Sequence, residues 1–588
     1  ATLAPHARPP PCARAMVLAL PAAADSVADP ESAAAVLKDL VRASLSADWR
    51  AEHTDDESLT ALRDFTLSHL DALDGVDGDP GVPEAPLSEG GDAAAAGPSG
   101  AAAARSDGLS EVCAACAKLA RNLCVGCPHV QEFWHRSDFV GRLLEHVCKD
   151  MARSRERPAT WCEAVPTFLA NSIAGHAELR AAACSTWFPY KLAAACTLCW
   201  RRPEHALMLV QNLVGASDTL PGGAGLPPFA RQLLDTADGH CIIYVLLSLL
   251  CSHGSGGAEE PGAASDRAWE WASIVFYNLW VGGGFEPCYR GVKRITAPAL
   301  HEFLFSAVSG RPPSAEEAPP LGVGRLVERM CGHAEALGLL WHSIQGLLGG
   351  GGSEDAPQLI RRLFGDPRFV ILAAEEMAGM VSRVTAEWEV DWCPEQPPEE
   401  AVRALGVADA GDLDALTLAN KAIMAGTLKG GGRASSSRVL SEICGAAVAL
   451  TAAAPSHSIQ VPPLLAGTYL VANVACLAAL HRLRFGDLGR GEVKKKPTKA
   501  AHEASEACSL LAQLRLCGNV VYRSHAAKEF LRLTGGLRVL LCHCYCDAEL
   551  PMLRENGILA LRNATEGNEA NQVAARALLA ESRVVSGA

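Results

Sequence analysis

The chain has 588 residues, of which 49% are hydrophobic, and it carries a formal net charge of −14. This length exceeds one ordinary core, so several domains or a repeat array are expected. The negative charge argues against a general nucleic-acid binder, because such proteins gain affinity by neutralising phosphates. We also find no apolar run of the roughly 18 residues that a membrane span needs.

The first hundred residues alternate between helical and non-helical composition. Residues 1–30 are rich in Ala, Pro and Arg, with no acid before Asp25, which fits a disordered tail or an organelle targeting segment. Residues 31–73 have the apolar periodicity of helices. Residues 74–108 are mainly Gly, Pro, Ala and acids, which predicts a disordered linker.

Residues 109–485 carry a long-period pattern of apolar helical segments that end near an Asn. These ends recur at Asn122, Asn171, Asn212 and Asn278, at intervals of 49, 41 and 66 residues. Gly/Pro-rich stretches at 217–228 and 253–264 lengthen the last interval. Armadillo and HEAT units repeat every 40–47 residues or so. The pattern therefore predicts an all-α solenoid of divergent armadillo-like repeats with disordered loop insertions.

The middle of the chain is less regular. Asn473 marks a further expected repeat, 46 residues before Asn519. Lys494–Lys496 and Lys499 lie in a basic segment at 486–500, which predicts a solvated loop or, alternatively, a nuclear-targeting patch. Apolar helices are predicted at Leu326–Leu348, Leu359–Val384, Leu413–Met424 and Val439–Ala453.

Residues 501–586 form the clearest pair of units, with Asn519 and Asn563 spaced 44 residues apart. Ser524 is placed to cap a short helix, and Gly535–Gly536 are placed to end it. A helix of medium length, a short one and a long one then make an armadillo unit, which buries its apolar face by stacking on its neighbours. We expect Leu514 and Leu561 in that core.

The stretch Leu561-Arg-Asn563-Ala-Thr-Glu-Gly567-Asn-Glu-Ala-Asn571-Gln572, with Leu516-Cys-Gly-Asn519 before it, resembles the C-terminal domain of the ataxin-10 family. The resemblance implies a non-enzymatic cytosolic scaffold that binds other proteins in cell division, cytokinesis and signalling. Self-association is a further expectation. The segment Arg554-Glu-Asn-Gly557 departs from the family pattern, and we expect it to weaken its helix because Gly costs about 1 kcal/mol against Ala.

The Asn residues are the candidate partner-binding residues. In armadillo-like solenoids the third helix of each unit lines a groove, where an Asn amide can pair with both backbone groups of an extended peptide. A bound helix is the other form such a partner takes, and neither nucleic acid nor a membrane is expected. The alternative, which local chemistry favours, is that these side chains cap their own helices or tie adjacent loops together. The candidates are Asn122, Asn171, Asn212, Asn278, Asn519 and Asn563.

The 22 cysteines are scattered, which is typical of reduced thiols used as small core residues. Cys113/Cys116 and Cys124/Cys127 are C-x-x-C pairs, but zinc sites usually have a longer spacer between the pairs. Cys542, Cys544 and Cys546 alternate, so one helix cannot point all three at one ion. No metal or cofactor is expected, and copper or zinc handling is kept as the alternative function. There is also no Walker A loop, zinc-protease helix or nucleophile elbow.

Overall fold

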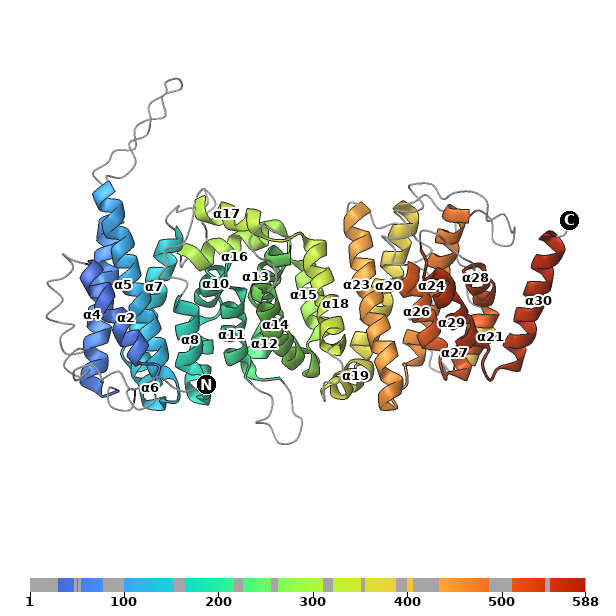
Figure 1. The fold of residues 1–588 in the computed structure, drawn as a ribbon, viewed down its shortest axis with the longest axis horizontal. Helices are drawn as coiled ribbons and strands as arrows, with labels where there is room; N and C mark the ends of the chain where they lie inside the picture. The colour runs from blue at the N-terminus through green and yellow to red at the C-terminus, as the bar shows by residue number, and fades with distance from the viewer. Residues whose placement is uncertain are drawn as a thin grey trace, which may run out of the picture. The chain divides into compact units, whose positions relative to one another are not determined.

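The computed structural model describes residues 30–46, 50, 54–77, 100–152, 164–215, 226–254, 263–309, 313, 321–349, 355–387, 399–405, 433–485, 510–544 and 550–586. Every regular element in these ranges is a helix. The predicted all-α class is confirmed (Figure 1). The predicted tail, the basic loop and most of the linker and insertions lie outside the described residues.

The chain divides into two compact units, and each has its own core. Unit 1 comprises residues 1–275 and 294–330, and unit 2 comprises residues 276–293 and 331–588. Helix α14 (Ala263–Val281) contains the division. The other helices of unit 1 are α2 (Pro30–Ala43), α4 (Asp56–Asp77), α5 (Gly100–Cys124), α6 (Pro128–Arg136), α7 (Phe139–Ala152), α8 (Val165–Ile173), α9 (Ala177–Trp187), α10 (Tyr190–Thr197), α11 (Pro203–Val214), α12 (Pro228–Asp235), α13 (Ala237–Gly254), α16 (Ala297–Ser309) and α17 (Leu321–Arg329).

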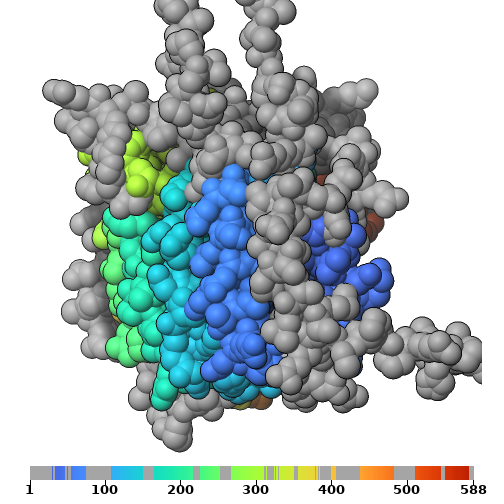
Figure 2. Space-filling model, turned by 90° about the vertical axis from the view of Figure 1, so that its left-hand side faces the viewer, coloured from blue at the N-terminus to red at the C-terminus, as the bar shows by residue number. Residues whose placement is uncertain are grey.

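Unit 1 is a stack in which α2, α5, α8 and α11 pack one against the next. Other helices connect them, and Pro at the first turn of α6, α8 and α11 suits a position that gives up no helical hydrogen bond. Trp134, Phe139 and Phe168 contact one another between these layers and are fully buried. Figure 2 views this N-terminal end, where the blue helices lie beside the cyan ones.

Unit 2 repeats the arrangement, with α18, α23, α26 and α29 packed in succession. Its core contains Trp280, Phe285 and Trp341 in ring contact. The helices of unit 2 are α15 (Phe285–Arg294), α18 (His333–Gly349), α19 (Ala356–Gly365), α20 (Pro367–Glu387), α21 (Glu399–Ala404), α23 (Arg433–Ala453), the 3-10 helix η4 (Ala454–His457), α24 (Pro463–Phe485), α26 (Leu510–Val521), α27 (His525–Leu533), α28 (Gly536–Cys542), α29 (Leu553–Thr565) and α30 (Glu569–Ser586).

Several sequence-based boundaries differ from the structure. Helical structure enters the predicted 74–108 linker from both sides, because α4 continues to Asp77 and α5 begins at Gly100. The Ala run at 101–104 has the highest helix propensity of any residue type, which explains the early start of α5. The segment Leu326–Leu348 is two helices separated at 330–332. Leu359–Val384 is likewise two, since Pro367 starts a new helix after Asp366.

The expectation that no segment has the length and apolarity of a membrane span was wrong. By length and composition alone, Arg438–His457 and Pro463–Arg482 both qualify in the described part of the chain, and the bent pair α12–α13 would make a third. Of the Pro463–Arg482 window, 94% is buried inside the protein, against α20, α26 and α28. A helix that is apolar all round is either a membrane span or a fully packed core helix.

Asn473 does not mark a helix end. It lies inside α24, is fully buried, and its Nδ2 donates to the carbonyl of Tyr469 in the same helix. The helix that precedes α26 in the stack is α23 instead, as the hydrogen bonds of Asn519 to α23 show below. The repeat predicted at Asn473 was therefore wrong, because helix-terminal and buried mid-helix asparagines look alike in sequence.

Candidate functional site

In unit 1 the predicted Asn residues connect successive layers of the stack. Asn171 Nδ2, on α8, donates to the carbonyl of Arg121 on α5 at 3.4 Å. Asn212 Nδ2, on α11, donates to the carbonyl of Ala170 on α8 at 2.9 Å. Each acceptor directly precedes the Asn of the previous layer, so the same bond recurs from layer to layer.

The same bond joins the layers of unit 2. Asn563 Nδ2, on α29, donates to the carbonyl of Gly518 on α26 at 3.1 Å, and Gly518 directly precedes Asn519. Asn519 Nδ2 donates to the carbonyl of Val448 and to Thr451 Oγ1 on α23, both at 3.4 Å. Asn122 makes the same pair of bonds, to the carbonyl of Val41 and to the hydroxyl of Ser44 three residues later.

The two remaining candidates differ in their surroundings. Asn122 is 5% exposed, and its Nδ2 donates to Ser44 Oγ at 2.9 Å and to the carbonyl of Val41 at 3.4 Å. Its Oδ1 accepts from the neighbouring Arg121 guanidinium. Asn278 is half-buried in α14 and belongs to unit 2. The predicted residues thus form two separate runs, 122–171–212 in unit 1 and 519–563 in unit 2.

These bonds match the alternative in which the amides tie adjacent layers together. These interlayer hydrogen bonds use the amide Nδ2 as the donor. They do not occupy the amide oxygen, Oδ1. We call the Asn residues that bond to the previous layer the ladder. Asn563 is half-buried, and its Oδ1 receives no hydrogen bond from the described residues. Binding of a peptide to the ladder stays a prediction, and it concerns the amide oxygens.

In several layers the residue four positions after the ladder Asn has a left-handed backbone conformation. Gly126, Gly175 and Gly567 stand there with φ of 71°, 73° and 66°. Glycine is the usual residue because a Cβ makes this conformation costly. After Asn519 the turn residue is Arg523, with φ of 56°. An arginine is thus held in a conformation that the other layers give to glycine.

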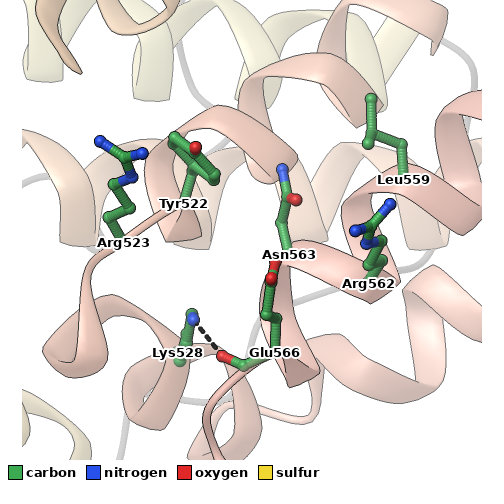
Figure 3. Close-up of a pocket in the computed structure, with 7 residues that line it drawn as sticks. All are labelled: Tyr522, Arg523, Lys528, Leu559, Arg562, Asn563 and Glu566. Carbon is green, nitrogen blue, oxygen red and sulfur yellow. Dashed lines mark hydrogen bonds between the residues drawn. The ribbon is translucent and has the colours of Figure 1, made fainter. Parts of the chain in front are cut away.

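A pocket of about 440 Å³ lies next to this arginine, between α26, α27 and α29 (Figure 3). Figure 3 shows Tyr522 and Arg523 on one side of Asn563, with Leu559 and Arg562 on the other. Tyr522 and Leu559 are 37% and 52% exposed, so both side chains are accessible to a bound partner. The residues that line the pocket are Tyr522, Arg523, Lys528, Leu559, Arg562, Asn563 and Glu566.

The cations of the pocket differ in what holds them. Lys528 is 8% exposed, and its ammonium donates to the backbone carbonyl of Glu566 at the C-terminus of α29, where a cation is favoured. The Arg523 guanidinium lies over the ring of Tyr522, 5.0 Å from its centroid. Arg562 is exposed. Of the residues that line the pocket, only Asn563 was predicted as a site residue; the others were missed, although an Arg at the glycine position of the turn is a readable signal.

Comparison with known proteins places this pocket inside a recognised domain. Residues 511–587 match the family described as "Spinocerebellar ataxia type 10 protein domain". A 59-residue stretch is 34% identical to the "Ataxin-10 homolog" of Dictyostelium discoideum. That match covers 10% of this chain and 10% of the relative.

We refer to residues 511–587, which match this family model, as the ataxin-10 domain. The predicted resemblance to the ataxin-10 family is confirmed on this domain. Among solved structures, that of an engineered protein aligns over 93% of this chain and 98% of its own, at 14% identity and a TM-score of 0.29. A structure described by a phosphorylation switch in the interaction between cadherin and β-catenin covers 89% and 99%, at 12% identity and a TM-score of 0.17. Scores this low carry no argument about fold or function.

The polar residues of the ataxin-10 motif hold its last helices together. Asn568 Oδ1 accepts from the backbone N–H of Asn571 at 2.9 Å and caps α30. Asn571 is fully buried, and its Nδ2 donates to the carbonyls of Lys528 on α27 and Ala564 on α29. Most of what makes this motif recognisable is therefore structural.

The departure at Arg554–Gly557 also has a structural explanation. A Cβ on Gly557 would lie 2.5 Å from the carbonyl oxygen of His543, so α29 reaches the end of α28 only because the residue is glycine. The Asn556 side chain accepts from Arg515 Nε at 3.0 Å and donates to the carbonyl of Met552 at 2.7 Å. The prediction that this segment weakens its helix left out these contacts, which tie α29 into the ataxin-10 domain.

The described cysteine candidates are buried or half-buried, with Cys127, Cys542 and Cys544 half-buried. Cys113, Cys116 and Cys124 are buried in α5. Burial raises the pKa of the Cys116 thiol to about 12, as expected for a thiol packed in a core. Among the described residues, no three His, Cys, Asp or Glu side chains are arranged to hold a metal ion, and Cys546 lies outside them.

Proposed function

We propose that the protein is a non-enzymatic scaffold for protein–protein interactions, and that its ataxin-10 domain binds an extended peptide segment of a partner. The observation that carries this proposal is the pocket beside Asn563. It combines exposed apolar side chains, cationic groups and an amide oxygen within one family domain. These are the features of a peptide-binding surface rather than of a packed core.

The contacts expected in the complex follow from the pocket lining. A peptide N–H can donate to Asn563 Oδ1, while Asn563 Nδ2 keeps its bond to α26. An apolar side chain of the peptide can pack on Leu559 and Tyr522, each of which is exposed before binding. Burying a leucine-sized side chain contributes about 1.5–3 kcal/mol.

The family associations extend the proposal to the cell. Roles in cell division, cytokinesis and signalling, a cytosolic location and self-association all come from the ataxin-10 resemblance. Copper or zinc handling and nuclear transport are less well supported, since the described residues contain no metal-binding group and Lys494–Lys499 lies outside them.

The test changes Leu559, because Asn563 also holds the fold together and would confuse the result. Tagged full-length protein with Leu559→Ser should capture about tenfold less of each partner than the parent does. The reason is that the lost burial of the leucine side chain is worth roughly 1.4 kcal/mol or more of binding free energy. Ile558→Ser is the matched control. Ile558 is the adjacent residue on α29, it is 45% exposed, and it does not line the pocket.

Quantitative mass spectrometry of the captured proteins provides the readout, with melting temperatures to confirm folding. If Leu559→Ser and Ile558→Ser retain the same partners as the parent protein, the pocket is not the binding site. Equal losses from both variants would likewise argue against it, because they would indicate a general surface effect.

A further inference from the structure

The charges of the pocket are unbalanced. Of its three cations, Lys528 donates a hydrogen bond to the carbonyl of Glu566, and Arg523 lies over the ring of Tyr522. Neither Arg523 nor Arg562 forms an ion pair with any carboxylate of the described residues. The chain as a whole carries a net charge of −14, so this cationic pocket differs in sign from the overall charge.

Three other arginines of the same domain are held by side-chain partners. Arg515 donates to Asn556 Oδ1, Arg532 bonds to Glu529, and Arg538 bonds to Glu581 at 2.9 Å. Two of these partners are carboxylates, those of Glu529 and Glu581. Glu566 is the one acid in the lining.

The backbone of Arg523 adds an independent reason to assign it a role. Its φ of 56° is left-handed, and glycine occupies the equivalent turn position after Asn122, Asn171 and Asn563. A residue other than glycine in this conformation costs backbone free energy, and such residues cluster at functional sites. Here that side chain lies over Tyr522 and lines the pocket.

We propose that this pocket selects acidic segments of partner proteins, with Asp or Glu carboxylates bound by Arg523 and Arg562. Arginine forms two parallel hydrogen bonds with a carboxylate, which gives direction as well as charge. A neighbouring apolar side chain of the same segment packs on Leu559 and Tyr522. This inference rests on the proposed function and names the chemistry of the peptide.

Carboxylates fit the pocket better than phosphates do. The Glu566 side chain lies within the lining, as Figure 3 shows, and it would repel a phosphate dianion more strongly than a single carboxylate. Arg523 and Arg562 flank Asn563 on opposite sides. An extended segment crossing Asn563 can therefore present acidic residues to both.

The test uses pools of fluorescent ten-residue peptides and the full-length protein. Each pool fixes one leucine and sets the flanking positions to Glu, Gln, Lys or phosphoserine, and anisotropy gives the dissociation constants. The Glu pool should bind about tenfold more tightly than the Gln pool, and the Lys pool should bind least. This preference should shrink as salt rises, because the exposed charges become screened.

Three variants connect the preference to the two arginines. Arg562→Gln and Arg523→Gly should each weaken the Glu pool several-fold and leave the Gln pool nearly unchanged. Arg576→Gln is the control, because Arg576 is exposed on α30 and does not line the pocket. Melting temperatures confirm that all three remain folded.

Each contrary outcome has a separate meaning. Equal binding of the Glu and Gln pools would overturn the acidic preference but leave peptide binding, and so the proposed function, in place. Tighter binding of the phosphoserine pool would overturn the choice of carboxylate. If no pool binds, the inference fails, and the capture experiment with Leu559→Ser then decides whether the proposed function fails with it.

Discussion

Single asparagine side chains hydrogen-bond one helical layer to the previous one. The same bond, from Nδ2 to a backbone carbonyl, recurs in both units. The 40–50 residue spacing was sufficient to find Asn122, Asn171, Asn212, Asn519 and Asn563 in the sequence. It could not give the direction of the amides, because a bond to the previous layer depends on how two helices far apart in sequence approach each other. The pocket residues beside Asn563 escaped notice for the same reason.

A buried histidine pair is another feature that depends on packing. His543, at the end of α28, is fully buried with its ring centroid 5.3 Å from that of His481 on α24. Burial lowers the pKa of His543 to about 4, with the backbone bond to Val539 acting weakly in the opposite direction. Burial also lowers the pKa of His481 to about 3, and the nearby His543 adds to this effect.

Acid should therefore destabilise the ataxin-10 domain. Below pH 6.5 the unfolded chain takes up a proton at position 543 that the folded chain refuses until about pH 4. Stability is then lost as the pH falls through this window, by up to about 3 kcal/mol for one such histidine. Urea unfolding at pH 7.5, 6.0 and 5.0 measures the slope.

His543→Gln provides the control for that slope. Glutamine does not titrate, so this variant should lose less stability on acidification than the parent does. It should also be less stable than the parent at pH 7.5. A parent and variant with parallel pH profiles would mean that other groups carry the acid sensitivity.

At the scale of elements, helices were predictable where local signals decide and were missed where contacts decide. Ser524 Oγ accepts from the N–H of Ala527, and Gly535 has a φ of 76°, so the predicted start and stop of α27 are confirmed. The prediction for Gly557 considered only helix propensity, which describes an isolated helix. The close approach of Gly557 to the carbonyl of His543, at the end of α28, exists only once the domain is assembled.

Gly557→Ala should therefore destabilise the protein, although Ala is the better helix former. The new Cβ would lie 2.5 Å from the carbonyl oxygen of His543, and backbone on both sides must shift, at a cost of about 1–3 kcal/mol. Gly346→Ala is the matched control. Gly346 is an exposed glycine inside α18 with open space around its Cβ position, and the change should stabilise by about 0.5–1 kcal/mol.

Denaturant unfolding of the two variants gives opposite signs if this account is right. An increase in stability for both would show that propensity alone governs α29, and that α28 can move away from it without cost. The comparison is informative because the two substitutions are chemically identical.

At the scale of the whole chain, repeat packing makes stability local. Each long helix packs on its neighbours in the stack, α26 on α23, α24 and α29, and the two units have separate cores. In such arrays the effect of a mutation is carried mainly through nearest-neighbour interfaces. The sequence predicted Leu514 and Leu561 in the core; Leu514 is fully buried, whereas Leu561 is half-buried. Periodicity gives the face of a helix but not the depth to which a neighbour covers it.

Leu514→Ala should remove about 2–5 kcal/mol of local stability, the usual cost of a cavity at a buried leucine. Hydrogen exchange should then speed up in α26 to α30 while α2 to α13 keep the parent's protection. Leu37→Ala is the reciprocal control, because Leu37 is equally buried in α2 of unit 1 and should produce the opposite pattern. Uniform loosening of both units by either variant would show one cooperative core instead of a stack, and the binding pocket could not then be destabilised apart from unit 1.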